Sequence, residues 1–463
     1  MFFSVYTLGC KLNQLETEAI TDSFSRKGFV FAHWNCVESA IRVINTCTVT
    51  SMAEQKARRI IRKALREYPE ACIIVTGCYA QMEKAALSAL EEEGSRRLFV
   101  IPGEKKDRLL DLPGFLEKAG TFSIGDGIGP ALPELIACWL EDVQKDPGDG
   151  TFRFKPESFS SHARAFLKIQ DGCDNRCSYC RVSPARGRSR SLEAGLALRE
   201  LKALEQRGFA EVVLTGVNIS QYRDSGIELP RLLDFLLKET ELIRLRLSSI
   251  EPEGLNDEFY RALKNERIRP HLHLSVQSGS PKILAKMGRL YNPEDIEKAA
   301  AIFRSIRHDP FLACDIIAGF PGETEADFQK TYELCEKTGF AWIHAFPFSP
   351  RPGTPAFTFP EKVSERDATR RVKLLTELAH KGRREYINRQ LGKEVEAVIE
   401  ASNQKSLPKD SVQGLSENYL KLSIKYGDKP TPAPGSLIRC QISQISTGHF
   451  DATAELLPNL SPC

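Results

Sequence analysis

The sequence lacks any apolar run long enough to cross a bilayer, and its first residues, MFFSVYTLGCKLNQ, do not show the charged-then-apolar pattern of a signal peptide. We therefore expect a protein of the cytoplasm that makes no membrane contact. The chain also lacks a large excess of either charge, since 64 Lys and Arg residues stand against 61 Asp and Glu residues. A net charge of +3 does not by itself predict nucleic-acid binding, so any such contact must come from local basic clusters.

The length and the cysteine content indicate a multidomain protein that binds metal. A chain of 463 residues with 41% hydrophobic content exceeds one ordinary domain and can fill two or three cores. Its 13 cysteines are scattered rather than grouped as in a small disulfide scaffold. In a reducing compartment, metal ligation is the better explanation for so many cysteines.

The first 130 or so residues repeat one unit three times: a short β-rich run, a cysteine at its end, and then a helical pattern. The runs are Phe2 to Gly9 before Cys10, Ile41 to Thr46 before Cys47, and Cys72 to Gly77 before Cys78. This βαβ series predicts a parallel sheet, whose strands share one carboxyl edge. We expect the three cysteines to converge at this edge. The alternative is that each cysteine is simply a small buried residue of the core, which explains one cysteine at a strand end more easily than three.

Two changes of pattern divide the rest of the chain. Residues 141–163 are rich in Pro, Gly, Asp and Ser and read as a connection between domains. From Arg164, six apolar strands alternate with amphipathic helices, which predicts a partial (β/α)6 barrel with its site at the carboxyl ends of the strands. After about Gln390, short strands and turns predict a small all-β barrel or sandwich.

The segment FLKIQDGCDNRCSYC places Cys173, Cys177 and Cys180 in a tight loop just after the first barrel strand. Three thiolates leave one iron of a 4Fe-4S cluster without a protein ligand, so a substrate can coordinate that iron. The C-x3-C-x2-C spacing resembles the radical S-adenosylmethionine superfamily, in which the methionyl amine and carboxylate bind the open iron. Zinc is the alternative, but a structural zinc site needs a fourth ligand and no nearby Cys or His completes the set.

Polar residues at later strand ends are candidates for binding the cofactor above the barrel. Gly216 is the expected point of close backbone approach, although a turn glycine is the plainer interpretation. Tyr179 in the cysteine loop is a candidate to flank the adenine, with packing on the barrel rim as its alternative. The complete set is Tyr179, Thr215, Gly216, Asn218, Ser248, Glu251, Gln277 and Asp315.

The order and spacing of the motifs TLGCKLNQLETE, VINTCTVT, VTGCYAQ, KIQDGCDNRCSYC, LTGVNI, HLSVQSGS, DIIAGFPGE and FSPRPGTPA resemble the methylthiotransferase family over nearly the whole chain. The resemblance implies two 4Fe-4S clusters, an auxiliary one on Cys10, Cys47 and Cys78 and a radical one on Cys173, Cys177 and Cys180. It divides the chain into an amino-terminal domain (1–140), a linker (141–163), a radical barrel (164–389) and an RNA-binding TRAM barrel (390–457).

The opening TLGCKLNQLETE is most similar to the branch that acts on N6-threonylcarbamoyladenosine at position 37, beside the tRNA anticodon. The implied reaction adds a methylthio group at adenine C2, with S-adenosylmethionine as methyl donor and radical source and with a flavodoxin-like or equivalent electron donor. One departure is that Arg181, Val182, Ser183 and Pro184 follow Cys180, where the family has two aliphatic residues and proline. This departure spares the cluster ligands and bears on local substrate contacts.

Local basic clusters are the candidates for RNA contact. Arg186, Arg188 and Arg190 alternate beside the radical cysteines, and Arg383 and Arg384 precede the carboxyl-terminal barrel. The helix that contains Arg59 carries a third cluster, for which a solvated face is an equal alternative.

Two other functions compete with this interpretation. One is methylthiolation of isopentenyladenosine in tRNA or of a ribosomal protein. The other is a non-catalytic iron–sulfur protein that binds RNA.

Overall fold

A computed structural model describes residues 1–91, 96–119, 132–145, 150–159, 162–401, 407–446 and 448–458. The chain divides into two compact units. The first comprises Met1–Ser160, Asp171–Arg190 and Ser349–Thr354; the second comprises Ser161–Gln170, Ser191–Phe348 and Pro355–Cys463. The segment with Cys173, Cys177 and Cys180 therefore belongs to the first unit, although it follows a barrel strand in the sequence.

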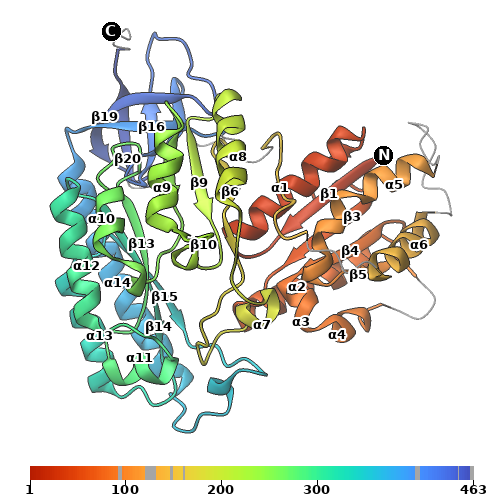
Figure 1. The fold of residues 1–463 in the computed structure, drawn as a ribbon, viewed down its shortest axis with the longest axis horizontal. Coiled ribbons are helices and arrows are strands. Elements are labelled where there is room, and N and C mark those ends of the chain that lie inside the picture. The colour runs from red at the N-terminus through yellow and green to blue at the C-terminus, as the bar shows by residue number, and fades with distance from the viewer. Residues whose placement is uncertain are drawn as a thin grey trace. The chain divides into compact units, whose positions relative to one another are not determined.

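The first unit contains a parallel five-stranded sheet, as the repeated βαβ pattern predicts (Figure 1). Its strands, in spatial order, are β2 (Val30–Phe31), β1 (Phe2–Thr7), β3 (Ser39–Thr46), β4 (Cys72–Gly77) and β5 (Leu98–Val100). Its helices are α1 (Lys11–Arg26), α2 (Ser51–Glu67), α3 (Cys78–Met82), α4 (Lys84–Ser88), the 3-10 helix η1 (Gly103–Leu110), α5 (Leu112–Lys118), α6 (Leu132–Lys145) and α7 (Val182–Arg186). The central strands β3 and β4 are buried along their whole length, which is why they read as continuous apolar runs.

Two hydrophobic cores cover the two faces of this sheet. One joins the strands to α1, α5 and α6 through residues such as Phe24, Leu116 and Trp139. The other joins them to α2 and α3 through Ile61 and Tyr79. The unit is thus a three-layer α/β/α structure.

Helix α6 extends to Lys145, into the segment 141–163 that was predicted to connect two domains. Residues 146–149 and 160–161 of that segment lie outside the described residues.

The second unit contains the six predicted barrel strands as two parallel three-stranded sheets, β12-β9-β6 and β13-β14-β15. The strands are β6 (Ala165–Lys168), β9 (Glu211–Thr215), β12 (Arg244–Leu247), β13 (His271–Gln277), β14 (Phe311–Ala318) and β15 (Trp342–Pro347). Isolated parallel bridges from Leu245 to Ile268 and from Ile250 to Leu274 continue the pairing from one sheet to the other. The predicted partial (β/α)6 barrel is confirmed.

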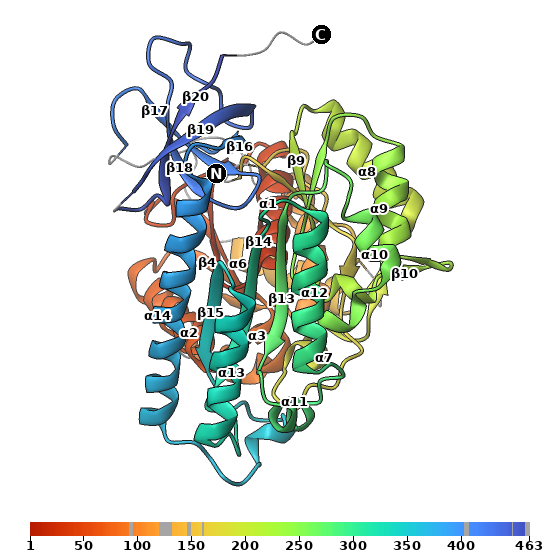
Figure 2. The ribbon, with the colours of Figure 1, turned by 90° about the vertical axis from the view of Figure 1, so that its left-hand side faces the viewer.

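Helices cover one face of these strands, and Figure 2 shows α12, α13 and α14 over β13, β14 and β15. The α-helices are α8 (Ala194–Gln206), α9 (Leu229–Lys238), α10 (Asp257–Ala262), α11 (Pro281–Met287), α12 (Pro293–Ile306), α13 (Glu325–Thr338) and α14 (Glu365–Gln390). Short elements connect them: the 3-10 helices η2 (Ile219–Gln221), η3 (Pro252–Gly254) and η4 (Pro355–Phe357), and the hairpin β10 (Arg223–Asp224) with β11 (Ile227–Glu228). Strands β7 (Gln170–Asp171) and β8 (Arg190–Ser191) lie where the chain passes from one unit to the other.

The carboxyl-terminal strands form a closed five-stranded barrel, as predicted. Their order is β16 (Glu394–Ile399), β17 (Ser411–Ser416), β18 (Lys421–Lys425), β20 (Ala452–Leu456) and β19 (Leu437–Ile445). The interior of this barrel is continuous with the core of the second unit, because Leu422 and Ile442 share one buried cluster with Phe311 of β14 and Tyr386 of α14. The small barrel is therefore an integral part of this unit.

A buried ion-pair network also joins the carboxyl-terminal barrel to the six-stranded partial barrel. Glu211 at the start of β9 accepts hydrogen bonds from Arg246 Nε (2.6 Å) and Arg269 Nε (2.7 Å), and Arg269 Nη1 donates to Glu396 of β16 (2.6 Å). Burial disfavours the charged form of Glu211, but the positive charges of Arg246, Arg269 and Arg164 outweigh this effect and hold the pKa of Glu211 far below its ordinary value.

In the described residues, no helix is both long and apolar enough to cross a membrane.

Candidate functional site

Three strand ends of the first unit bring Cys10, Cys47 and Cys78 together. Cys10 caps α1 after β1, Cys47 follows β3 directly, and Cys78 opens α3 after β4. The thiols are close enough to influence one another: burial, together with the nearby Cys10 and Cys78, raises the pKa of Cys47 to about 12. The predicted convergence at the carboxyl edge of the sheet is therefore present in the structure.

Two glycines explain how the three cysteine segments come so close. Gly9 has φ +103°, and a Cβ atom there would lie 2.6 Å from the Cβ and 2.8 Å from the Sγ of Cys47. Gly77 has φ +102°, and a Cβ atom there would lie 2.3 Å from the carbonyl oxygen of Thr46. Each glycine precedes a cysteine, so glycine is needed at both positions for conformation and for space.

The loop with Cys173, Cys177 and Cys180 also begins with a glycine of positive φ directly before a cysteine. Gly172 has φ +72°, and a Cβ atom there would lie 1.9 Å from the carbonyl oxygen of Arg188, across the loop. Cys173 N donates to Gly187 O (3.1 Å), which closes the loop, and all three thiols are partly exposed. The loop is thus compact and presents three cysteines that are not in disulfides.

Arg181, which follows Cys180 directly, attaches this loop to two helical segments of the first unit. Its buried guanidinium donates to Glu54 Oε1 of α2 (3.1 Å) and to Glu83 Oε1 after α3 (2.7 Å). Arg351, also buried, pairs with the same Glu54. The position at which the sequence departs from the family pattern is therefore an anchoring point for the loop.

Arg186, at the other end of the loop, reaches the helix that begins after Cys10. Its Nη1 donates to Glu16 (3.0 Å) and Asp171 (3.1 Å), and its Nη2 donates to Asn13 (3.0 Å). Burial opposes its charge, but the nearby Cys78, Glu16 and Asp171 raise the pKa of Arg186 well above its ordinary value. This placement differs from the RNA contact that we predicted, because the guanidinium is buried among carboxylates of its own unit.

Both cysteine sets have the chemistry of iron–sulfur ligands. None of the six cysteines is in a disulfide, and backbone N–H groups point to two of the sulfurs, from Val49 to Cys47 (3.5 Å) and from Val182 to Cys180 (3.3 Å). Hydrogen bonds of this kind to cluster sulfurs tune reduction potentials. Among the described residues, no three Cys, His, Asp or Glu side chains are grouped around a point that fits a single metal ion. The residues present fit a cluster held by thiolates.

Polar residues at the barrel edge of the second unit form a connected network. Gln170 Oε1 accepts from Asn218 N (2.9 Å), and Asn218 Nδ2 donates to Glu251 Oε2 (2.8 Å). Arg289 Nη1 donates to the other oxygen of Glu251 (2.7 Å). Gly216 makes room for Gln170, because a Cβ atom at Gly216 would lie 2.8 Å from Gln170 Oε1. The second and third strand ends are therefore held together by the predicted residues Asn218 and Glu251.

Other predicted cofactor contacts lie at strand ends, within β14 and in the cysteine loop. Gln277 ends β13 with φ +64°, a conformation that is uncommon for a residue with a side chain and that often marks functional sites. Ser248 is buried, and its hydroxyl has no hydrogen-bond partner among the described residues. Thr215 is buried at the end of β9, Tyr179 is partly exposed in the cysteine loop, and Asp315 is partly exposed on β14. Their contacts with a cofactor remain predictions.

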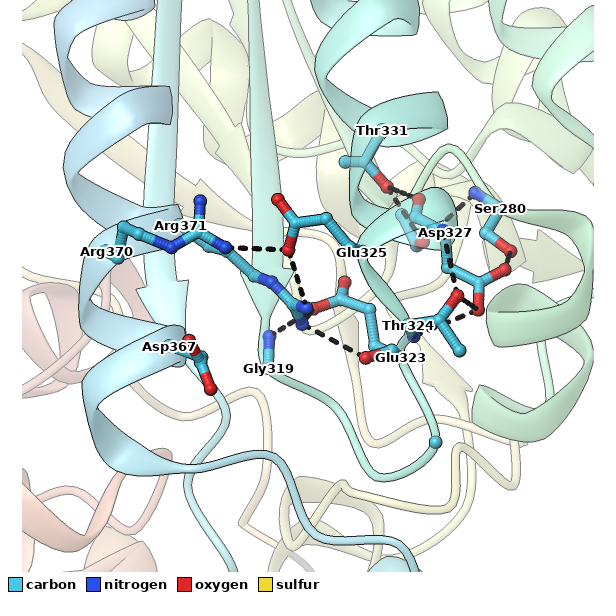
Figure 3. A network of polar contacts seen from close by, with 12 residues as sticks. Ser280, Gly319, Glu323, Thr324, Glu325, Asp327, Thr331, Asp367, Arg370 and Arg371 are labelled. Atoms are coloured by element: carbon cyan, nitrogen blue, oxygen red, sulfur yellow. Dashed lines mark hydrogen bonds and ion pairs between the residues drawn. The ribbon is translucent and has the colours of Figure 1, made fainter.

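The turn after β14, which carries the motif AGFPGET, is fixed by a network around Glu323 (Figure 3). Glu323 accepts from Gly319 N (2.6 Å) and from Arg371 Nη1 of α14 (2.7 Å). Next to it, Asp327 accepts from Thr324 Oγ1 and Ser280 Oγ, both at 2.7 Å. Side-chain hydrogen bonds therefore tie the backbone at this strand end to α14 and to Ser280.

The remaining predicted RNA-binding arginines fall into two groups. Arg188, Arg190 and Arg384 are exposed. Arg383 is instead paired with Asp451 (2.6 Å) and lies over the rings of Phe311 and Trp342. It therefore holds α14 to the carboxyl-terminal barrel, a role that its sequence position does not reveal.

Comparison with known proteins identifies the class to which this fold and site belong. Residues 167–335 match the model described as Radical SAM superfamily, and residues 3–97 match Uncharacterized protein family UPF0004. A solved structure of the radical S-adenosylmethionine methyltransferase TsrM from Kitasatospora setae has the same fold, with a TM-score of 0.51 and 16% identity over 77% of this chain and 76% of that chain. The protein is thus a radical S-adenosylmethionine enzyme, a class that uses S-adenosylmethionine and a 4Fe-4S cluster.

The relatives identify the family within this class. A threonylcarbamoyladenosine tRNA methylthiotransferase from Treponema pallidum is 40% identical, over 95% of this chain and 97% of its own length. A protein with the same description from Thermotoga maritima is 37% identical, over 90% of both chains. The chain belongs to the radical S-adenosylmethionine methylthiotransferase family, as the motifs indicate.

Proposed function

We propose that this protein adds a methylthio group at C2 of N6-threonylcarbamoyladenosine at position 37 of tRNA. The observation that carries the proposal is the presence of two sets of three cysteines in one compact unit, none of them in a disulfide and each set introduced by a glycine with positive φ. The descriptions of the relatives from Treponema pallidum and Thermotoga maritima support the choice of substrate.

The proposed division of labour assigns a 4Fe-4S cluster to each cysteine set. Cys173, Cys177 and Cys180 would hold the cluster that opens one iron to S-adenosylmethionine, and Cys10, Cys47 and Cys78 would hold the auxiliary one. When bound, these groups supply the electron, the radical and the sulfur chemistry that acid–base side chains cannot supply at an unactivated C–H bond. The protein residues supply position: Arg181 and Arg186 attach the loop with Cys173, Cys177 and Cys180 to the helices that follow Cys10, Cys47 and Cys78.

The same proposal assigns roles to the parts of the chain. Residues 1–140 would carry the auxiliary cluster, 164–389 the radical barrel and 390–457 a TRAM-type RNA-binding barrel, with 141–163 as the linker. A tRNA substrate supports a cytoplasmic location, and reductive cleavage of S-adenosylmethionine requires an electron donor such as a flavodoxin. Exposed Arg188, Arg190 and Arg384 are the proposed phosphate contacts.

The test is mass spectrometry of tRNA nucleosides from cells with and without the gene. We expect the methylthio derivative of threonylcarbamoyladenosine to disappear on deletion and to return on complementation. Loss of methylthiolated isopentenyladenosine instead would assign the protein to the other tRNA branch. An unchanged nucleoside profile, with no 5′-deoxyadenosine formed by the reduced protein, would favour a non-catalytic iron–sulfur protein.

A further inference from the structure

The strands β13, β14 and β15 have one mostly buried face and one face that is open in part. Leu274 on β13, Ile316 on β14 and Ile343 on β15 are buried, on the face that α12 and α13 cover (Figure 2). Side chains at the alternate strand positions, such as His273, Asp315 and His344, point to the other face and are partly or fully exposed. Because side chains alternate along a strand, these residues share the inner face of the half-barrel.

The amino end of this inner face is closed by the carboxyl-terminal barrel. Tyr419 stacks on His271 of β13 (ring centroids 4.4 Å apart), which in turn stacks on Phe311 of β14 (5.6 Å). All three rings belong to the second unit, and Phe311 belongs to the core that it shares with the small barrel. His273, Asp315 and His344 therefore form the first accessible layer above an aromatic floor.

This layer combines two imidazoles, one carboxylate and aromatic rings. His273 Nε2 lies 2.9 Å from Asp315 Oδ2. The His273 and His344 rings are nearly parallel with centroids 5.3 Å apart, and Phe346 lies parallel to His344 one step closer to the carboxyl edge. Phe346 is 43% exposed, so its face is available to a planar ring. The mechanism outlined above does not use the two histidines, and the sequence motifs gave no reason to select them.

Trp342 determines which nitrogen of His344 carries the hydrogen. The indole Nε1–H donates to His344 Nδ1 (3.3 Å), so Nδ1 is an acceptor and the neutral ring carries its hydrogen on Nε2. His344 is exposed, and its Nε2–H is a donor whose position is fixed by Trp342 and by stacking on His273. A donor on the inner face, beside an exposed aromatic ring, suits an anionic group attached to a base.

We propose that His344 binds the carboxylate of the amino-acid substituent on the substrate adenine while the adenine stacks on Phe346. This inference rests on the proposed function and specifies how the substrate would be recognised. A threonylcarbamoyl group carries one carboxylate and one hydroxyl, which match the donor on His344 and the acceptor on Asp315. An isopentenyl group carries neither, so this polar layer disfavours it.

The test compares two RNA ligands on the full-length, anaerobically reconstituted protein. Fluorescence anisotropy gives the Kd of an anticodon stem-loop with threonylcarbamoyladenosine and of the same stem-loop with unmodified adenosine. We expect the wild type to prefer the modified RNA by roughly tenfold or more, the effect of one hydrogen bond to a charged group. His344→Phe keeps the ring and removes the donor, so the two affinities should become nearly equal, with the unmodified RNA bound as before.

Controls separate this site from folding effects and from the cofactor. His308→Phe replaces an exposed histidine outside the sheet and should keep the wild-type preference. His344→Gln restores a polar N–H and should keep part of the preference, which provides a second measurement if His344→Phe does not fold. Formation of 5′-deoxyadenosine without RNA should be equal in wild type and His344→Phe.

Three results would overturn the proposal. The first is a full preference for the modified RNA in both His344→Phe and His344→Gln. The second is loss of 5′-deoxyadenosine formation in His344→Phe with the preference intact, which would place His344 at the cofactor. The third is an equal affinity of the wild type for both RNAs. Failure of the proposed function is a separate result, namely no methylthio product from wild-type enzyme and the modified RNA.

Discussion

Gly77→Ala is the most informative single substitution in the amino-terminal sheet, because it changes the backbone at a cysteine set without changing a thiol. Gly77 joins β4 to Cys78 with φ +102° and ψ −170°, a region that residues with a side chain almost never occupy. A Cβ atom at this position would lie 2.3 Å from the carbonyl oxygen and 2.7 Å from the nitrogen of Thr46. Both atoms belong to the backbone of β3, so no flexible side chain can move aside.

The expected cost has two parts. A residue with a side chain in this conformation costs about 1–3 kcal/mol. Separating the ends of β3 and β4 to relieve the clash costs about another 1–3 kcal/mol, as for other overpacked sites. Gly28→Ala is the matched control, because Gly28 has φ +83° with no atom within 4 Å of the added Cβ and should cost only about 1–2 kcal/mol.

Urea unfolding of the apo-protein and iron analysis after anaerobic reconstitution measure these effects. We expect Gly77→Ala to lower the free energy of unfolding by about 2–6 kcal/mol and to lose about one cluster of iron, because β4 can no longer present Cys78 next to Cys47. Gly28→Ala should keep all the iron. If Gly77→Ala kept both the wild-type iron content and the wild-type stability, the packing argument for the glycine–cysteine pairs would be wrong.

Three further substitutions test other parts of the structure. Glu211→Gln should lower the free energy of unfolding by about 3–5 kcal/mol in urea titrations at neutral pH, since it leaves Arg246 and Arg269 buried without their anion. Because the pKa of Glu211 is lowered in the folded protein, the difference from wild type should shrink as the pH falls into the acid range, and a pH-independent difference would contradict this assignment. Arg186→Gln should reduce the iron content and shift the midpoint potential in redox titrations, whereas Arg186→Lys should restore part of both; equal effects of the two variants would indicate a packing role only. Replacing exposed Lys421 and Lys425 of β18 with Ala should weaken tRNA binding and reduce its salt dependence by about one unit of slope per lysine that contacts phosphate, and an unchanged slope would place the RNA elsewhere.

Local patterns in the sequence predicted most of the fold. Continuous apolar runs predicted the buried strands β3 and β4, and the βαβ order placed Cys10, Cys47 and Cys78 at one sheet edge. The change to short strands after Gln390 predicted the closed carboxyl-terminal barrel. These features depend on periodicity and on the direction of neighbouring strands, both of which are visible along the chain.

The partners of charged residues could not be predicted in the same way. Glu54 and Glu83 look like ordinary helix charges in the sequence, yet they receive Arg181 from a loop about 100 positions away. Arg186 and Arg383 sit in basic runs that suggest phosphate binding, but each is paired with carboxylates of its own unit. The departure from the family pattern after Cys180 indicated a change in local substrate contacts and gave no sign of the ion pairs that Arg181 makes with Glu54 and Glu83.

The histidines of the barrel's inner face were missed for a related reason. His273 and His344 lie far apart in the sequence, and each alternates with apolar residues as an ordinary half-buried strand residue does. Only the parallel pairing of β14 with both neighbours brings them to the same face, where His273 is level with Ala313 and His344 is level with Asp315. Register, rather than composition, created that cluster.

Truncation after Gln390 is a poor test of RNA binding in this structure, although the sequence suggests it. The cut would expose Phe311 and leave Arg269 without Glu396, because the small barrel shares its core and ion pairs with the radical barrel. Substitutions on its surface keep that core intact.

The most direct test of the two-cluster account is one reaction carried out with the Cys47→Ala and Cys177→Ala enzymes. Each enzyme is reduced and supplied with S-adenosylmethionine and with tRNA that contains threonylcarbamoyladenosine. Mass spectrometry then measures 5′-deoxyadenosine and the methylthio nucleoside. The account predicts that Cys47→Ala forms 5′-deoxyadenosine but no methylthio nucleoside, whereas Cys177→Ala forms neither, because the two thiols belong to sets with different chemistry. Methylthio nucleoside from the Cys47→Ala enzyme would contradict the account, since it would show that the amino-terminal cysteines are not needed to deliver sulfur.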